Sequence, residues 1–240
     1  MKKRRPVERI GHRGAPLEIM ENTLASFERA FERGADAIEL DVHATADGVV
    51  VVHHDPTVPS ADEPGFRDRR PIAKLTSAQL RSAQLRSTQL SGSSDGRARI
   101  PTLTEVLAVV PPGATVYVEI KATGIESLVA QTIASSSARC AVHSFDENTI
   151  REMRALAPAV PRGLLFDEYP RDVANSMHRA AARDMWPRWE LIDRQLVEAV
   201  HAQRGRVIAW TVNSLDAATE LVRLGVDGLC SDDVRLFEAL

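Results

Sequence analysis

The sequence has little of several features that mark particular protein classes. Its only two cysteines, Cys140 and Cys230, each lie in an apolar stretch, so a disulfide framework is not supported. No apolar run is long enough to span a membrane, and no secretory apolar region follows the basic start, so the expected location is cytoplasmic. A formal net charge of −3 gives no general attraction to nucleic acid or to an anionic membrane.

What the sequence does contain is a regular alternation of strand-like and helix-like segments, which is typical of a parallel sheet with crossover helices. Nine apolar strand candidates follow from Val7 onward, and the last six lie at residues 115–121, 140–145, 162–166, 184–187, 207–212 and 228–231. A closed barrel needs eight strands and about 250 residues. We therefore predict a single (β/α)8 barrel domain over residues 1–240. An open doubly wound sheet is the alternative, but no Gly-x-Gly-x-x-Gly turn follows any strand.

The ninth strand candidate belongs to a predicted hairpin between Ala37 and Asp55. Its Asp-Gly turn predicts a two-residue connection, which would place Asp41 directly opposite His54. Glu39 and Asp41 are two residues apart, so both would project from the face that also carries His54. The hairpin therefore predicts a divalent metal site with an adjacent acid or base, next to one antiparallel strand near the second barrel strand.

Residues 56–99 interrupt the alternation with a poorly patterned segment rich in Pro, Ser, Arg and Gln. Leucines recur in it every five residues, at Leu75, Leu80, Leu85 and Leu90. Five residues turn a helix by about 500°, so these leucines would spiral around it and would not form a single stripe. We predict a small insertion over the barrel, helical in part and weakly packed, with no interface that defines an oligomeric state.

Further polar residues follow the predicted barrel strands, where such barrels carry their active sites. Two examples are Glu119 and Lys121, which lie two residues apart and face one side of their strand. Asn22 is predicted to cap the first helix. His143 lies inside a strand, and a core histidine is the simpler interpretation of it. The gathered acids, bases and Arg13 are typical of a site for a hard cation and an anionic substrate.

These motifs, taken together, resemble the glycerophosphodiester phosphodiesterase family. The matching segments are Gly11-His-Arg-Gly-Ala15, Glu21-Asn-Thr23, Ile38-Glu-Leu-Asp-Val42, Asp47-Gly48, Val52-His-His-Asp55, Ile100-Pro-Thr-Leu103, Glu119-Ile-Lys121, Ser144-Phe145, Trp210-Thr-Val-Asn213 and Gly225-Val-Asp-Gly228. They run in order from residue 7 to about residue 232 and leave the insertion uncovered. The Arg-Thr-Thr-like segment usual after the His-Asp pair is missing here, so the residues that contact the alcohol half of the substrate do not transfer.

The resemblance implies a barrel enzyme that hydrolyses glycerophosphodiesters to sn-glycerol 3-phosphate and an alcohol with Mg²⁺ or Ca²⁺. Carried over position by position, it implies Glu39, Asp41 and Glu119 for the metal, His12 and His54 for the acid/base pair, Arg13 and Lys121 for the phosphate, and Trp210 for an apolar wall beside the substrate. The expected partner is a small phosphodiester, with no nucleic acid.

The chemistry of these residue types agrees with that implication. A metal with two cationic side chains neutralises a phosphodiester, and oxygen ligands suit Mg²⁺ or Ca²⁺. We assign His12 as the base and His54 as the acid, with either water or the glycerol 2-hydroxyl as nucleophile. Two alternatives stay open: a lysophospholipase-D-like or cyclising phosphodiesterase acting on lysophospholipids, and a barrel that binds phosphorylated molecules without turnover.

Overall fold

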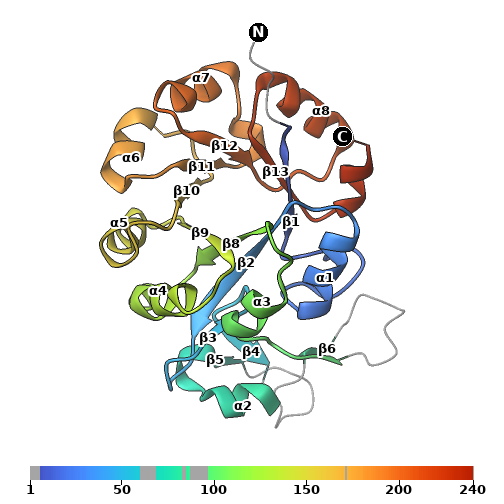
Figure 1. Cartoon of the computed structure of the whole chain (residues 1–240), viewed down its shortest axis with the longest axis vertical. Coiled ribbons are helices and arrows are strands. Elements are labelled where there is room, and N and C mark those ends of the chain that lie inside the picture. The colour runs from blue at the N-terminus through green and yellow to red at the C-terminus, as the bar shows by residue number, and fades with distance from the viewer. Residues whose placement is uncertain (1–5, 60–68, 83–84, 87–96, 171, 240) are drawn as a thin grey trace.

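A closed barrel of eight parallel strands forms the centre of the molecule (Figure 1). The computed structural model describes residues 6–59, 69–82, 85–86, 97–170 and 172–239. The barrel strands are β1 (Glu8–His12), β2 (Ala37–Ala44), β8 (Thr115–Ile120), β9 (Arg139–Ser144), β10 (Arg162–Phe166), β11 (Asp184–Pro187), β12 (Arg206–Ala209) and β13 (Gly228–Ser231). Because β1 pairs in parallel with both β13 and β2, the sheet closes on itself. The predicted (β/α)8 barrel is confirmed.

Helices surround this barrel (Figure 1). They are α1 (Leu24–Glu32), α3 (Leu103–Val109), α4 (Glu126–Ala134), α5 (Glu147–Leu156), α6 (Val173–Ala180), α7 (Arg194–Ala202) and α8 (Leu215–Leu224), with short 3-10 turns η2 (Trp189–Leu191) and η3 (Val234–Glu238). Each longer helix turns an apolar stripe inward, as α5 does with Ile150 and Met153. Among the described residues, no helix combines the length and the apolarity needed to cross a membrane.

The interior of the barrel is a packed core. Each of the eight strands contributes one buried side chain to it: Ile10, Ala37, Tyr117, Ala141, Leu165, Trp186, Ile208 and Cys230. At the amino-terminal end of the strands, the Tyr117 hydroxyl donates to Glu8 at 2.7 Å, and Arg206 donates to that hydroxyl at 3.0 Å. Side chains therefore fill this end among the described residues, and barrels of this kind carry their active sites at the carboxyl end of the strands.

The hairpin exists, but its predicted register is wrong by one residue. The antiparallel strand β3 (Val50–Val52) pairs Val42 with Val52, and the backbone N–H of His53 donates to the carbonyl of Asp41 at 2.9 Å. Asp41 therefore faces His53, while His54 lies beyond the paired residues. The cause is the turn: Gly48 has φ +78° and its N–H donates to the carbonyl of Thr45, which makes a three-residue loop in place of the two-residue loop we predicted.

The first helix begins one residue later than predicted. Thr23 is the N-cap, and its side chain accepts from the N–H of Ser26. Asn22 instead adopts φ +56°, and its amide donates to Asp41 at 2.9 Å. An asparagine tolerates this left-handed conformation better than most residues. The residue predicted as a helix cap is thus a contact of the barrel's acidic side chains.

The insertion is better packed than the leucine spacing indicated. Its described elements are β4 (Thr57–Pro59), β5 (Arg69–Pro71), η1 (Ile72–Lys74), α2 (Ser77–Ser82), β6 (Leu85–Arg86) and β7 (Arg97–Ala98). Leu75 and Leu80 are 3% and 2% exposed and belong to a cluster that includes Val51 of β3. The prediction of weak packing is therefore wrong for these two leucines, and Leu90 lies outside the described residues.

Candidate active site

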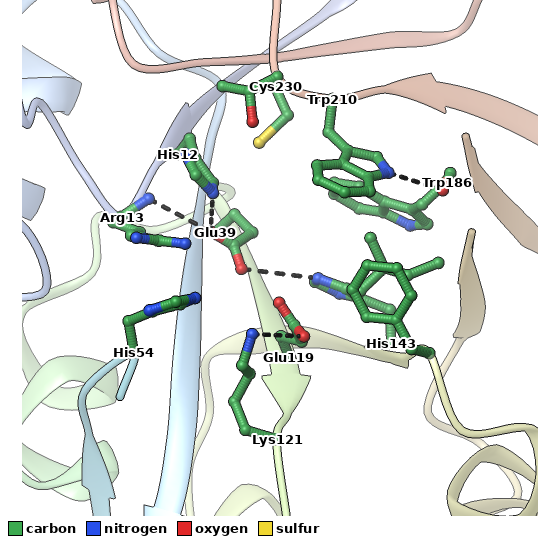
Figure 2. Close-up of a pocket in the computed structure, with 13 residues that line it drawn as sticks. His12, Arg13, Glu39, His54, Glu119, Lys121, His143, Trp186, Trp210 and Cys230 are labelled. Atoms are coloured by element: carbon green, nitrogen blue, oxygen red, sulfur yellow. Dashed lines mark hydrogen bonds and ion pairs between the residues drawn. The ribbon is translucent and has the colours of Figure 1, made fainter. Parts of the chain in front are cut away.

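A cavity of about 280 Å³ opens at the carboxyl end of the barrel strands. Its wall contains His12, Arg13, Glu39, His54, Glu119, Lys121, His143, Phe145, Leu165, Trp186, Trp210, Thr211 and Cys230. Seven of the eight predicted site residues are among them, and Asp41 is the exception. Figure 2 shows the acids in the centre, the basic side chains on one side and aromatic rings on the other. The cavity is therefore polar on one wall and apolar on the opposite wall.

Two carboxylates and an imidazole come together at the centre of the cavity. One donor atom from each of Glu39, Glu119 and His143 lies within 4.8 Å of the other two, and all three residues are buried. Burial raises the pKa of Glu119, the nearby carboxylate of Asp41 raises it further, and the resulting value is about 7. A cation between these donors would relieve the repulsion between the buried carboxylates. This part of the site could hold a metal ion.

Asp41 lies beside this group and contacts two cations. Its carboxylate is 3.1 Å from Nε of Arg13 and 3.5 Å from Nζ of Lys121, while its side chain is fully buried. Burial would raise the pKa of Asp41, but the two cations and the Asn22 amide outweigh it and hold the pKa at about 2. Asp41 is therefore a permanent anion that positions the two basic side chains at the cavity.

Arg13 owes its position to the turn that follows β1. It has φ +54°, and its backbone N–H donates to Glu39 at 3.2 Å. The next residue, Gly14, has φ +96°, and a Cβ there would lie 2.4 Å from Oγ of Ser26. Only glycine fits this close approach to the first helix. A left-handed conformation is unfavourable for a residue other than glycine, so the surrounding structure must hold Arg13 in it. Such strained residues cluster at functional sites.

His12 has a carboxylate partner that the sequence analysis did not identify. Its Nδ1 lies 2.6 Å from Oδ1 of Asp232, and Asn213 holds Asp232 by donating to Oδ2 at 2.7 Å. Burial lowers the pKa of His12, but the Asp232 hydrogen bond and the charge of Glu39 outweigh it, so the pKa lies above its ordinary value. Since an ionised carboxylate only accepts, Nδ1 carries a proton and Nε2 faces the cavity side. One feature of the sequence could have identified Asp232 as a site residue: it directly follows the last strand.

His54 reaches the same cavity from the end of the hairpin (Figure 2). Its Nδ1 lies 2.9 Å from Oδ1 of Asp55, so this ring also pairs Nδ1 with a carboxylate. His12 and His54 therefore share one arrangement, although His12 ends β1 and His54 lies in the turn after β3. The converging histidines that we predicted are both present, but the route that brings His54 there is a turn after β3 and not a cross-strand pair.

The opposite wall of the cavity is aromatic. Trp210 donates from Nε1 to the carbonyl of Trp186 at 2.8 Å, and the Phe145 ring meets Trp210 edge-on at 5.6 Å. His143 stacks on Trp186 at 4.3 Å, is 1% exposed, and has no hydrogen-bond partner at Nδ1 among the described residues. It is buried as predicted, but it also borders the cavity and lies 3.6 Å from Glu39.

Comparison with known proteins gives consistent results. Residues 12–236 match the model of the glycerophosphoryl diester phosphodiesterase family. The glycerophosphodiester phosphodiesterase of Caldanaerobacter subterraneus subsp. tengcongensis is 32% identical over 233 residues, which cover 93% of each protein. The match extends across the insertion and nearly the whole barrel.

Solved structures resemble the chain in fold. The glycerophosphodiester phosphodiesterase of Thermotoga maritima superposes with a TM-score of 0.81 at 24% identity and covers 98% of both chains. A phosphodiesterase of Oleispira antarctica, solved in complex with the product sn-glycerol 3-phosphate, superposes with a TM-score of 0.82 at 23% identity. That alignment covers 97% of this chain and 95% of the Oleispira chain.

Proposed function

The chain belongs to the glycerophosphoryl diester phosphodiesterase family, and on that basis we propose that it hydrolyses glycerophosphodiesters to sn-glycerol 3-phosphate and an alcohol. The observation that carries the proposal is the pairing of two imidazoles, His12 and His54, with separate carboxylates on the basic wall of one cavity. A barrel that only bound phosphate would need the cations but would not need two such histidines.

The metal in this proposal is Mg²⁺ or Ca²⁺, held by Glu39 and Glu119 with Asp41 next to them. Two observations support the fit. Donor atoms of Glu39, Glu119 and His143 lie close together, and the pKa of Glu119 is raised to about 7 when no cation is bound. Carboxylate oxygens are the ligands that these hard cations prefer. When bound, the metal would supply positive charge to the phosphoryl oxygens.

Arg13 and Lys121 bind the phosphate in this proposal. Both cations border the cavity, and each is held in place by Asp41. Their charges would be aimed at the non-bridging oxygens of the diester before the reaction begins. Such preorganised positive charge stabilises the transition state of an anionic substrate more than mobile water can.

His12 and His54 move the protons. Nε2 of His12 takes the proton from the attacking oxygen, which is water or the glycerol 2-hydroxyl, while that oxygen bonds to phosphorus. The bond from phosphorus to the alcohol oxygen breaks, and the departing oxygen takes a proton from Nε2 of His54. With water as nucleophile this step gives sn-glycerol 3-phosphate directly. With the 2-hydroxyl it leaves a cyclic phosphate, which water then opens while the two histidines exchange roles. Asp232 stabilises the imidazolium that forms on His12, since it accepts from Nδ1 at 2.6 Å.

Trp210 and Phe145 line the side of the cavity away from the cations and would contact the less polar part of the substrate. Phe145 is 47% exposed at the cavity edge, which favours lysophospholipids as a second candidate substrate class. An acyl chain leaving the cavity over this ring would gain apolar contact. Non-catalytic phosphate binding stays the third, disfavoured possibility.

The test is a product assay on a small substrate panel. Purified protein is given glycerophosphocholine, glycerophosphoethanolamine and the matching lysophospholipids, with Mg²⁺ or Ca²⁺ and then with excess chelator. We expect metal-dependent release of sn-glycerol 3-phosphate from the deacylated diesters. Faster turnover of the lysophospholipids would favour the second candidate, and binding without any product would contradict both enzymatic proposals.

A further inference from the structure

Asp55 lies between two basic side chains that come from different parts of the chain. Its Oδ1 is 2.9 Å from Nδ1 of His54, and its Oδ2 accepts from Nη2 of Arg69 at 2.7 Å. Arg69 belongs to β5, in the insertion, whereas His54 follows the hairpin. One carboxylate therefore connects the insertion to a histidine of the cavity wall.

The guanidinium of Arg69 is oriented by more than this ion pair. Its Nε donates to Oγ1 of Thr57 at 2.7 Å, and Nη2 also donates to the carbonyl of Thr57 at 2.8 Å. The planar fork of an arginine loses little further freedom once two of its edges are fixed in this way. Arg69 thus presents one N–H to Asp55 in a defined direction.

Strand β5 has its own attachment to the barrel. It pairs with β4, where Pro59 faces Arg69, and Ile72 just after it is 1% exposed in the cluster that contains Val51 of β3. Arg69 and Asp55 themselves are 45% and 49% exposed. An isolated ion pair at such exposure adds little to stability. The contact is therefore better explained by what it does to His54 than by what it adds to the fold.

The backbone of His54 is fixed independently. Nε2 of His43 lies 3.1 Å from the carbonyl of His54, and a carbonyl only accepts, so His43 donates. His43 is 6% exposed, and burial lowers its pKa, which keeps it neutral in this role. With the main chain held by His43, the ring direction of His54 depends on the partner of Nδ1.

We propose that Arg69 and Asp55 are positioning residues that hold His54 with a proton on Nδ1 and with Nε2 directed to the substrate. Arg69 keeps the carboxylate of Asp55 charged and turned toward His54, so Nδ1 keeps its proton while Nε2 exchanges one. The inference rests on the proposed function, in which Nε2 of His54 gives its proton to the leaving alcohol. The insertion then completes the catalytic site and does not merely cover it.

The test compares Arg69→Ala, Arg69→Lys and Asp55→Asn with the matched control Arg70→Ala. Arg70 is the next residue of β5, where it faces Val58 of β4, so its side chain projects from the opposite face of the strand to that of Arg69. We expect Arg69→Ala and Asp55→Asn to lower kcat about tenfold to 100-fold, the usual effect of losing the partner behind a functional histidine. KM should stay within about twofold. Arg69→Lys should recover part of the loss, and Arg70→Ala should match the wild type.

Two further readouts separate positioning from a general structural effect. In a His54→Ala background, Arg69→Ala should cause no further loss, because residues that act through one another are not additive. With a p-nitrophenyl leaving group, which departs without a proton, the defect of Arg69→Ala should shrink. Thermal melting of each variant checks that the fold is retained.

The inference is overturned if Arg69→Ala keeps the wild-type kcat, if it raises only KM, or if its effect adds fully to that of His54→Ala. An increase in KM alone would mean that Arg69 contacts the substrate directly. Failure of the proposed function looks different: the wild-type protein itself would then release no sn-glycerol 3-phosphate with either metal.

Discussion

Nδ1 of His12 lies 2.6 Å from Oδ1 of Asp232, although 220 positions separate the two residues in the chain. The contact exists because the first and last strands of the barrel pair directly, with Gly11 beside Ser231. Closing the barrel therefore builds the carboxylate-histidine pair that the proposed proton transfer needs. Asn213 completes it, since its amide N–H donates to Oδ2 of Asp232 and its amide oxygen accepts from the backbone N–H of Asp232.

Asp232→Asn is expected to lower kcat by about 100-fold or more, since an amide can fix the wrong tautomer of His12 and cannot stabilise its imidazolium. Steady-state hydrolysis of glycerophosphocholine measures this. The matched control is Asp233→Asn, one residue further on, where the carboxylate pairs with Arg235 at the surface. A kcat within twofold of wild type for Asp232→Asn would contradict the role given to this pair.

Metal affinity should depend on pH through Glu119. In the metal-free protein the pKa of Glu119 is raised to about 7, so a cation must displace its proton below that pH. We expect the affinity for Mg²⁺ to rise about tenfold per pH unit up to pH 7 and to level off above it. Calorimetry at several pH values, in buffers of different ionisation enthalpy, measures both the affinity and the released proton.

The variant Glu119→Gln provides the control for that experiment. It should bind the metal weakly and lose the dependence on pH between 5 and 7. An affinity of the wild-type protein that is constant over this range, with no proton released, would show that Glu119 is not a ligand.

Asp41→Asn is expected to destabilise the protein by about 3 kcal/mol, because it leaves the largely buried Arg13 and Lys121 without their shared anion. The pKa of Asp41 is lowered from 3.8 to about 2, so its contribution is complete above pH 3.8 and disappears as the pH falls through 2. Urea unfolding at pH 7 with chelator present measures the loss. Equal stability of the variant and the wild type would argue against this charge network.

Leu80→Ala should cost about 2–5 kcal/mol, the range for emptying a buried leucine site. Leu80 is 2% exposed in the cluster that attaches the insertion to β3, so the same variant should also reduce kcat through Arg69 and His54. Leu17→Ala is the control, since Leu17 is 52% exposed. Chemical unfolding together with the product assay would test both effects. An unchanged free energy of unfolding would mean that the insertion packs loosely, as the leucine spacing suggested.

Much of the barrel could be predicted, because the apolar pattern that identifies each strand or helix lies within that element itself. Strands β10, β11 and β13 have the predicted limits, since each depends on its own apolar pattern and on the polar residues around it. The hairpin register could not be obtained in this way. Asp47-Gly48 marks a turn, but whether the loop has two or three residues depends on the backbone conformation at Gly48.

The parts of the site that escaped prediction depend on long-range contacts. Asp232 and Asn22 carry no periodic pattern, and each acquires a role only when the folded barrel brings it to His12 or Asp41. Arg69 gave no signal in the sequence, because its contact with Asp55 requires the pairing of β4 and β5. Glu119 and Lys121 could be placed at the cavity from their strand alone, since a parallel barrel gathers all strand ends at one rim. Asp232 also follows a strand directly, but its partner His12 lies 220 positions away, so its position alone did not reveal its role.

Metal-dependent hydrolysis by this chain is tested by the release of sn-glycerol 3-phosphate from glycerophosphocholine, measured for the purified wild-type protein and for Glu39→Gln. Glu39 contacts the backbone N–H of Arg13 at 3.2 Å and lies among the proposed metal donors. We expect product from the wild type with Mg²⁺ or Ca²⁺, none after chelation, and a loss of at least about 100-fold in the variant. Metal-independent release, or equal rates for the two proteins, would contradict this expectation.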